Sequence, residues 1–171
     1  MFGVDVGLLT LRLILGIVFL AHGVKHAQSR EKTTKWFASI GFRNAPFQWF
    51  MSTATEIGVG VLMVAGLLTG FAAAGVVGIM FVAFWSVHRS AGFFITAFMK
   101  EGIDVEGWEY VFVLAAVAAA LALAGPGTIA LDSVFGLDVL FDGWIGAALI
   151  GLGVGAGAGL LAVFWRPAES G

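Results

Sequence analysis

Long runs of apolar residues, separated by short polar segments, dominate this sequence. A helix of about 20 mostly apolar residues crosses the roughly 30 Å hydrocarbon core of a bilayer. Five segments fit this description, at residues 4–22, 47–68, 71–87, 108–123 and 143–165. The pattern therefore predicts an all-α membrane protein with five transmembrane helices.

The segments between these spans carry further patterns. The four residues "LTGF" join the second and third spans, which predicts a tight antiparallel pair, and "GPGTIALD" ends the fourth span with helix-stopping Gly and Pro. In the 29–42 loop, Trp36, Phe37 and Ile40 share one helical face, and the 91–100 loop repeats such spacing with Phe93 and Phe94. We expect both loops to form short interfacial helices at one end of the bundle. The alternative is that they are simple membrane-anchored loops.

Composition supports a membrane protein. Apolar residues make up 60% of the chain, charged residues make up 12%, and the mean hydropathy is +0.99. An average soluble domain is about a quarter charged, so a soluble globule is excluded. The absence of cysteine excludes disulfides, thiolate metal sites and CxxC redox chemistry. The first apolar segment lacks a basic start and a cleavage site, so we expect a retained helix, and nothing indicates nucleic-acid binding.

The basic residues predict the orientation. Eight of the nine Lys and Arg residues lie between spans one and two, between spans three and four, or after span five. The opposite side carries only Asp5, Asp132, Asp138 and Asp142. Because basic loops stay in the cytoplasm, we expect the N-terminus outside and the C-terminus in the cytoplasm.

Arg12 and Glu56 are ionisable residues inside the predicted spans, where charges are costly and usually paired. Counting residues from opposite membrane faces places their backbones within about 5 Å of one depth, a gap that an Arg side chain bridges. The sequence therefore predicts a buried Arg12–Glu56 ion pair. Alternatively, Glu56 accepts protons beside a ligand cavity.

His22, His88 and Glu109 come from three different spans and lie near the cytoplasmic boundary, with Trp108 beside Glu109. Because His titrates near neutral pH, this constellation predicts a proton-handling site for a redox ligand. The proton-handling candidates are Glu56, His88 and Glu109. The candidate cofactor-binding residues are His22, Arg12, Glu56, His88 and Trp108.

The histidines are also compatible with simpler roles. Lys25 and His26 are predicted to be polar residues at the membrane rim, and His22 has the same alternative. Ligation of haem b by His22 and His88 fits their similar depth, although nothing else in the sequence requires haem. A metal site at His22 and His26 is weak because no carboxylate partner is evident, so no metal is predicted.

The last span carries a ladder of glycines in "GLGVGAGAGL", with Gly151, Gly155 and Gly159 at four-residue spacing and Gly153 with Gly157 between them. Small residues at this spacing allow two helix backbones to approach closely. The ladder predicts packing within the bundle and against another membrane protein subunit, through the face of Gly151, Gly155 and Gly159. A homo-oligomer is one form of this contact.

The succession "LRLILGIVFLAHGVKH", "TEIGVGVLMVAGLLTGFAAAG", "VHRSAGFF" and "GPGTIALD" resembles the DoxX family of small bacterial membrane proteins. The matching positions are Arg12, His22, Gly23, Glu56, Gly58, Gly60, His88, Glu109, Gly125, Pro126, Gly127 and Asp132. The resemblance implies a four-helix membrane bundle over residues 1–132, related to the DoxD-type subunit of thiosulfate:quinone oxidoreductase. Residues 133–171 add a fifth, Gly-rich helix and a short cytoplasmic tail. The implied location is the bacterial inner membrane.

The main functional hypothesis is a small membrane subunit of a quinone-linked oxidoreductase or oxidative-stress complex, which binds a quinone near the cytoplasmic leaflet. No flavin, iron–sulfur or nucleotide motif is present, so a partner would supply the electrons and the chain alone would catalyse nothing. The alternative is a non-catalytic anchor or assembly subunit that packs against partner proteins. A transporter is disfavoured because no broken helices or inverted repeat are evident.

Overall fold

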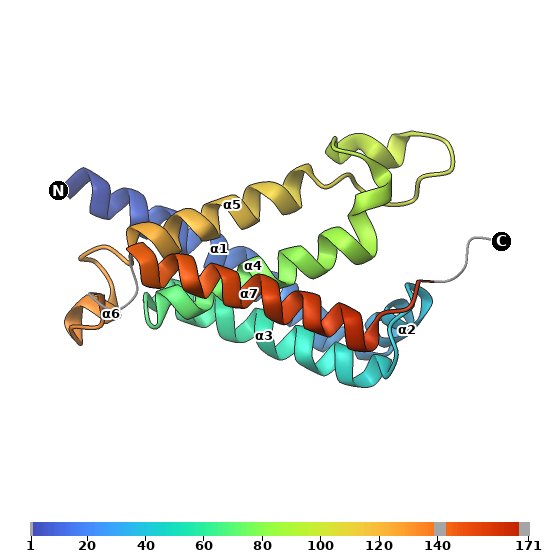
Figure 1. Cartoon of the computed structure of the whole chain (residues 1–171), viewed down its shortest axis with the longest axis horizontal. Helices are drawn as coiled ribbons and strands as arrows, with labels where there is room; N and C mark the ends of the chain where they lie inside the picture. Colours follow the sequence, from blue (N-terminus) through green and yellow to red (C-terminus); the bar gives the residue numbers. More distant parts are fainter. Residues whose placement is uncertain (1, 139–142, 168–171) are drawn as a thin grey trace.

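The structure, a computed structural model, describes residues 2–138 and 143–167. Within these residues the chain is mainly helical, and five long helices run side by side, with the first and last described residues at opposite ends (Figure 1). The long helices are α1 (Phe2–Gln28), α3 (Ala45–Ala65), α4 (Thr69–Ala83), α5 (Glu109–Ala124) and α7 (Gly143–Phe164). The shorter elements are α2 (Arg30–Ser39), the π-helical η1 (Phe84–His88), η2 (Arg89–Ala91), η3 (Ile95–Met99) and α6 (Leu131–Val134). The predicted all-α membrane fold is confirmed.

Length and hydropathy vary among the five helices. Three helical stretches of the described chain, at Phe2–Gln28, Thr69–Ala91 and Gly143–Phe164, are long and apolar enough to cross a membrane, and α5 is apolar but shorter. Helix α3 has a suitable length but carries the buried polar residues Gln48, Thr53 and Glu56. Polar side chains on a membrane helix usually face the bundle interior, so α3 presents polar groups to the inside of this bundle.

The helices pack closely where glycines face each other. Gly16 of α1 lies against the backbone of α3, where a Cβ atom on Gly16 would come within 3.0 Å of the Gly60 carbonyl oxygen. Gly78 of α4 lies against Gly153 and Gly157 of α7 in the same way. Around these crossings lies the core, which includes Leu15, Phe19, Val59, Met63, Ala73, Val76, Ala118 and Leu121.

One face of α7 is packed and another is open. Gly153 and Gly157 are buried against α4. Gly151, Gly155 and Gly159 are exposed, and a Cβ placed on them meets nothing within 4 Å beyond its chain neighbours and the backbone of α7 itself. The glycine ladder therefore has an inner set that holds α7 in this bundle. Gly151, Gly155 and Gly159 form an outer set, and a partner that packs on it stays a prediction. The division of the chain into two parts at residue 132 also stays a prediction.

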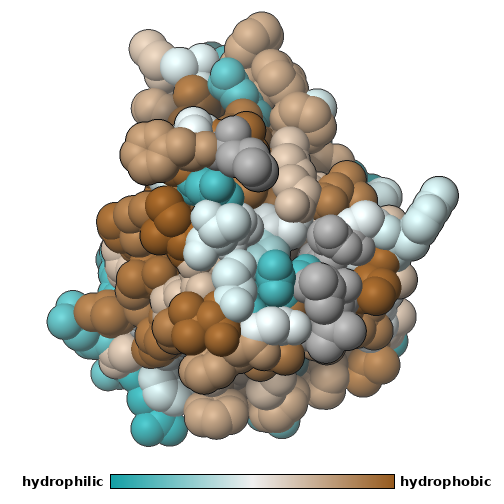
Figure 2. All heavy atoms as spheres, turned by 90° about the vertical axis from the view of Figure 1, so that its left-hand side faces the viewer, coloured by the Kyte–Doolittle hydropathy of each residue, from teal (hydrophilic) through white to brown (hydrophobic). Residues whose placement is uncertain are grey.

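A cluster of polar groups joins three segments at the end of the molecule that carries the N-terminus. The Arg12 guanidinium donates hydrogen bonds to the carbonyl oxygens of Met63 and Ile129, and the charge of Asp132 acts on it. Asp132 in turn accepts hydrogen bonds from the amides of Leu68 at 2.6 Å and Thr69 at 2.8 Å. We call these groups the Arg12 cluster. On the surface of this end, hydrophilic residues form small patches surrounded by hydrophobic ones (Figure 2).

Backbone hydrogen bonds join α7 to the loop after α2 at the opposite end. The Arg43 amide donates to the Phe164 carbonyl at 2.8 Å, and the Arg166 amide donates to the Gly41 carbonyl at 2.8 Å. The predicted helix in the 29–42 loop is present as α2, but Phe37 packs inward on Phe42 instead of facing outward with Trp36. The 91–100 loop forms the short 3₁₀ turn η3 in place of a longer helix.

Replacing Asp132 with alanine should destabilise the protein strongly. The change removes the acceptor of two backbone amides at the start of α4 and a negative charge that acts on the buried Arg12, so we expect a loss of about 2 kcal/mol or more in the free energy of unfolding. Unfolding in detergent, followed by circular dichroism, measures the loss. Asp138→Ala, in the same loop, is the control and should change little; equal effects would contradict this account.

Gly153→Ala and Gly155→Ala form a matched pair on α7. A Cβ atom on Gly153 would overlap the Ala74 carbonyl oxygen, so we expect a loss of about 1–3 kcal/mol in the free energy of unfolding. A Cβ atom on Gly155 meets nothing, and alanine favours a helix by up to about 1 kcal/mol over glycine. Thermal unfolding of both variants tests this, and an equal loss would contradict the packing described.

Candidate functional site

A cavity of about 590 Å³ lies among α1, α2, α3, α4, α5 and α7. Its walls extend along α4 from Phe71, near the start of the helix, to His88 at the end of η1. Most of the lining is apolar or small, including Gly75, Gly78 and Ala83 of α4. A cavity of this size and character is typical of a small-molecule or lipid-tail site.

Polar side chains are placed in this cavity by helical periodicity. Gln48, Ser52 and Glu56 of α3 are four residues apart, so they lie on one face of the helix, and all three line the cavity. His22 and His26 of α1 have the same spacing and line the facing wall. The π-helical η1 adds Ser86 and His88. Single-turn π-helices occur often at functional sites.

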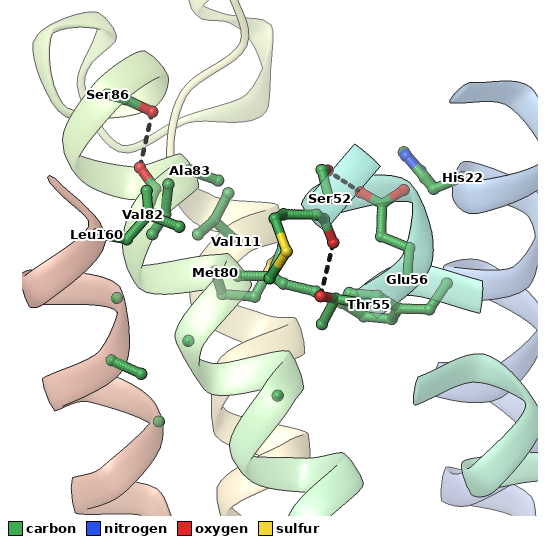
Figure 3. A pocket seen from close by; sticks show the side chains of 18 of the residues that line it. His22, Ser52, Thr55, Glu56, Met80, Val82, Ala83, Ser86, Val111 and Leu160 are labelled. Atoms are coloured by element: carbon green, nitrogen blue, oxygen red, sulfur yellow. Dashed lines mark hydrogen bonds between the residues drawn. The ribbon is translucent and has the colours of Figure 1, made fainter. Parts of the chain in front are cut away.

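Glu56 is the buried charge among these groups. Its residue is 5% exposed, and its Oε1 accepts a hydrogen bond from Ser52 Oγ at 3.2 Å. Figure 3 shows the carboxylate between Ser52 and His22. Its Oε2 lies 2.9 Å from His26 Nδ1, close enough for an ion pair, but the two atoms are not aligned as a hydrogen bond. Glu56 Oε2 thus lies beside the His26 ring without a hydrogen-bond donor among the described residues.

The predicted ion pair between Arg12 and Glu56 is wrong, because Arg12 lies in the Arg12 cluster and Glu56 lies beside His26. Met63, which Arg12 contacts, is about two helical turns, or about 10 Å, from Glu56 along α3. The crossing of Gly16 and Gly60 fixes the alignment of the two helices, and α1 continues to Gln28 beyond the end of the apolar run. The count of residues from the two membrane faces assumed that each helix ends where its apolar residues end, and this assumption misplaced Arg12 relative to Glu56.

The prediction that His26 is a rim residue is also wrong. Its side chain is 21% exposed and pairs with Glu56. Trp49 Nε1 donates to the His26 carbonyl oxygen at 2.9 Å, which holds this turn of α1 against α3. His26 therefore connects the buried carboxylate with the surface.

The other predicted site residues are divided between the cavity and its surroundings. His22 and His88 line the cavity, and His88 Nδ1 lies 2.7 Å from the Glu106 carbonyl oxygen. Glu109 accepts a hydrogen bond from the Ile95 amide at 3.0 Å and does not line the cavity. Trp108 likewise lies outside the lining and packs edge-on against Phe84, Phe93 and Phe112. The functional roles proposed for these residues stay predictions.

Sequence reasoning missed Gln48 and Ser52, although one signal was available. Gln48 and Ser52 lie eight and four residues before Glu56, and this spacing marks a polar face on an otherwise apolar helix. Among the described residues, no group of three or more His, Cys, Asp or Glu side chains is close enough to hold a metal ion. The site is thus a single buried carboxylate among histidines, hydroxyls and an amide.

Comparison with known proteins gives two matches. The DoxX family model matches residues 7–89. Over 128 residues the chain is 33% identical to "Putative oxidoreductase CatD" from Bacillus subtilis (strain 168). The aligned region covers 75% of this chain and 86% of that protein. The chain belongs to the DoxX family. No solved structure matches it. In this DoxX protein the family region contains His22, His26, Gln48, Glu56 and His88, so it includes the polar part of the cavity.

A double-mutant cycle on His26→Gln and Glu56→Gln should reveal a coupling between the two residues. Because the pair is largely buried, we expect an interaction free energy of about 0.5–3 kcal/mol from unfolding in detergent. Lys35→Gln and Glu31→Gln provide the matched control, since that pair, 2.6 Å apart, is exposed to solvent. Exposed pairs contribute little. A coupling no larger than in the control would contradict the assigned pairing.

Proposed function

We propose that this protein is the membrane subunit of a quinone-linked oxidoreductase and that its cavity binds the quinone. The observation that carries the proposal is one long apolar cavity with the buried Glu56 among the polar side chains of its wall. A lipid quinone has the same division into a polar ring and an apolar tail. The DoxX relative named as an oxidoreductase gives the reaction class independent support.

The cavity walls suit the two parts of such a ligand. Apolar residues that line the cavity along α4 and α7, such as Met80, Ala83 and Leu160, would contact an isoprenoid tail. The ring would lie beside His22, Ser52 and Glu56, where hydrogen-bonding side chains are concentrated. A few polar groups in an otherwise apolar pocket are what fixes the orientation of a ligand.

The polar residues also meet the need for protons. A quinone takes up two protons with two electrons on reduction, so titratable groups beside the ring serve as proton donors and acceptors. Glu56 lies inside the cavity, and the partly exposed His26 lies 2.9 Å from its Oε2. His26 thus offers Glu56 a route for protons from the surface. The sequence has no flavin or nucleotide motif, so we propose that a partner subunit supplies the electrons.

The orientation belongs to the same proposal. Basic residues in α2 and at Arg89, Lys100 and Arg166 belong to the end of the bundle at which α7 finishes. By the positive-inside rule this end faces the cytoplasm of the inner membrane, and the N-terminus lies outside. His26 and His88 would then lie at the cytoplasmic opening of the cavity.

A second candidate function, a membrane anchor for partner subunits, is favoured by one observation. The outer set Gly151, Gly155 and Gly159 is exposed and meets no atom of the described chain. Such a face suits close packing against another membrane helix, whether of a partner or of a second copy. Anchoring and quinone binding use different faces of α7 and are compatible.

Quinone binding can be tested by filling the cavity. Ala83→Phe should occlude the tail channel, so a decyl-substituted benzoquinone, titrated against tryptophan fluorescence in detergent, should bind at least about tenfold more weakly than to the unaltered protein. Organic extraction of the purified protein should also recover less native quinone from this variant.

Ala116→Phe is the control, since Ala116 is exposed on α5 and is not part of the cavity lining. It should bind the benzoquinone as the unaltered protein does. No saturable binding by any of the three proteins would overturn the proposed function. A Soret band in the unaltered protein would instead identify haem as the cofactor.

A further inference from the structure

We propose that the cavity prefers the reduced, hydroxyl-bearing form of its ligand, the quinol, over the oxidised quinone. This inference rests on the proposed function and assigns the redox form that the site recognises. A quinol donates hydrogen bonds through its two hydroxyl groups, whereas a quinone only accepts them through its carbonyl oxygens. The preference follows from whether the lining presents acceptors or donors.

Three serine and threonine hydroxyl groups of the lining use their hydrogens elsewhere. Thr55 Oγ1 donates to the Met51 carbonyl at 2.7 Å, Ser86 Oγ donates to the Val82 carbonyl at 2.8 Å, and Ser52 Oγ donates to Glu56 at 3.2 Å (Figure 3). A hydroxyl has a single hydrogen and two acceptor lone pairs. Toward a ligand these three side chains therefore offer only lone pairs.

Glu56 adds a fourth acceptor. As a carboxylate it has no hydrogen to donate, and its Oε1 is already bound to Ser52. Its Oε2 is buried without a hydrogen-bond donor among the described residues, with His26 near it but out of line. A ligand hydroxyl would provide the missing donor, and a ligand carbonyl oxygen would instead face a like partial charge.

His88 adds a fifth acceptor because its tautomer is fixed. Its Nδ1 lies 2.7 Å from the Glu106 carbonyl oxygen, which accepts but never donates, so Nδ1 carries the hydrogen. In the neutral imidazole the other nitrogen, Nε2, then has a lone pair. The π-helical turn of η1 brings this ring to the cavity wall.

The lining also contains donors, and they set the size of the preference. The amide nitrogen Nε2 of Gln48 is buried without a partner among the described residues, and His22 and Tyr110 are further donors. These groups allow the quinone to bind, but more weakly. Leaving one or two acceptors unpaired weakens binding by about tenfold or more. A tenfold preference for quinol raises the potential of the bound two-electron couple by about 30 mV.

The test compares both redox forms of one probe on the purified full-length protein in detergent. A decyl-substituted benzoquinone and its dithionite-reduced quinol, kept under argon, are titrated by calorimetry. We expect the quinol to bind about tenfold more tightly than the quinone. Glu56→Gln should reduce the ratio of the two affinities toward one, because the amide presents a donor of the same shape. Glu31→Gln, at an exposed side chain of α2 outside the cavity lining, should leave the ratio unchanged.

A second variant and a spectroscopic measurement guard against a folding defect in Glu56→Gln. His88→Ala, at the cavity wall, should also lower the ratio, and ¹⁵N chemical shifts should show His88 protonated at Nδ1. Equal affinities in the unaltered protein, or a tighter quinone, would overturn this inference and leave the proposed function standing. Failure of both forms to bind would overturn the proposed function itself.

Discussion

A guanidinium buried within a membrane bundle must find acceptors and a counter-charge, and in this protein that requirement joins the helices. Arg12 is 1% exposed and binds the carbonyl oxygens of Met63 and Ile129 beside Asp132. Met63 lies in the last turn of α3, where its carbonyl oxygen also accepts a hydrogen bond from the Gly66 amide at 3.2 Å. Arg12 therefore adds a second donor to the Met63 carbonyl and supplies one to the Ile129 carbonyl, and it attaches α1 to the end of α3 and to the segment that follows α5.

The candidate site depends on that attachment. With Arg12 held near Met63, Gly16 crosses Gly60, and one further contact, of Gly23 with Glu56 and Ile57, follows toward the other end. This alignment brings His26 to Glu56. A shift of α1 by one turn, about 5.4 Å, would separate the pair. The cluster at one end of the bundle thus fixes which side chains meet in the cavity near the other end.

The helices were predictable because apolar periodicity is local, whereas the partners of the buried charges depend on how helices align. Hydropathy ended the first span at His22, but α1 continues to Gln28 because α3 packs beside it, and this extra length gave His26 its partner. Nothing local marks Asp132 as the cap of α4, since its contacts are more than sixty residues away in sequence. The π-helical turn at His88 also has no sequence signature.

Two buried carboxylates in the same bundle help to distinguish structure from function. Asp132 is fully buried, and each of its oxygens accepts a backbone amide hydrogen bond, as a structural charge requires. Glu56 is nearly as buried, yet its Oε2 lies at a cavity wall without a hydrogen-bond donor from the described chain. A fold that satisfies one carboxylate completely has the means to satisfy the other. In the proposed site, the hydrogen of a ligand hydroxyl completes the shell of Glu56.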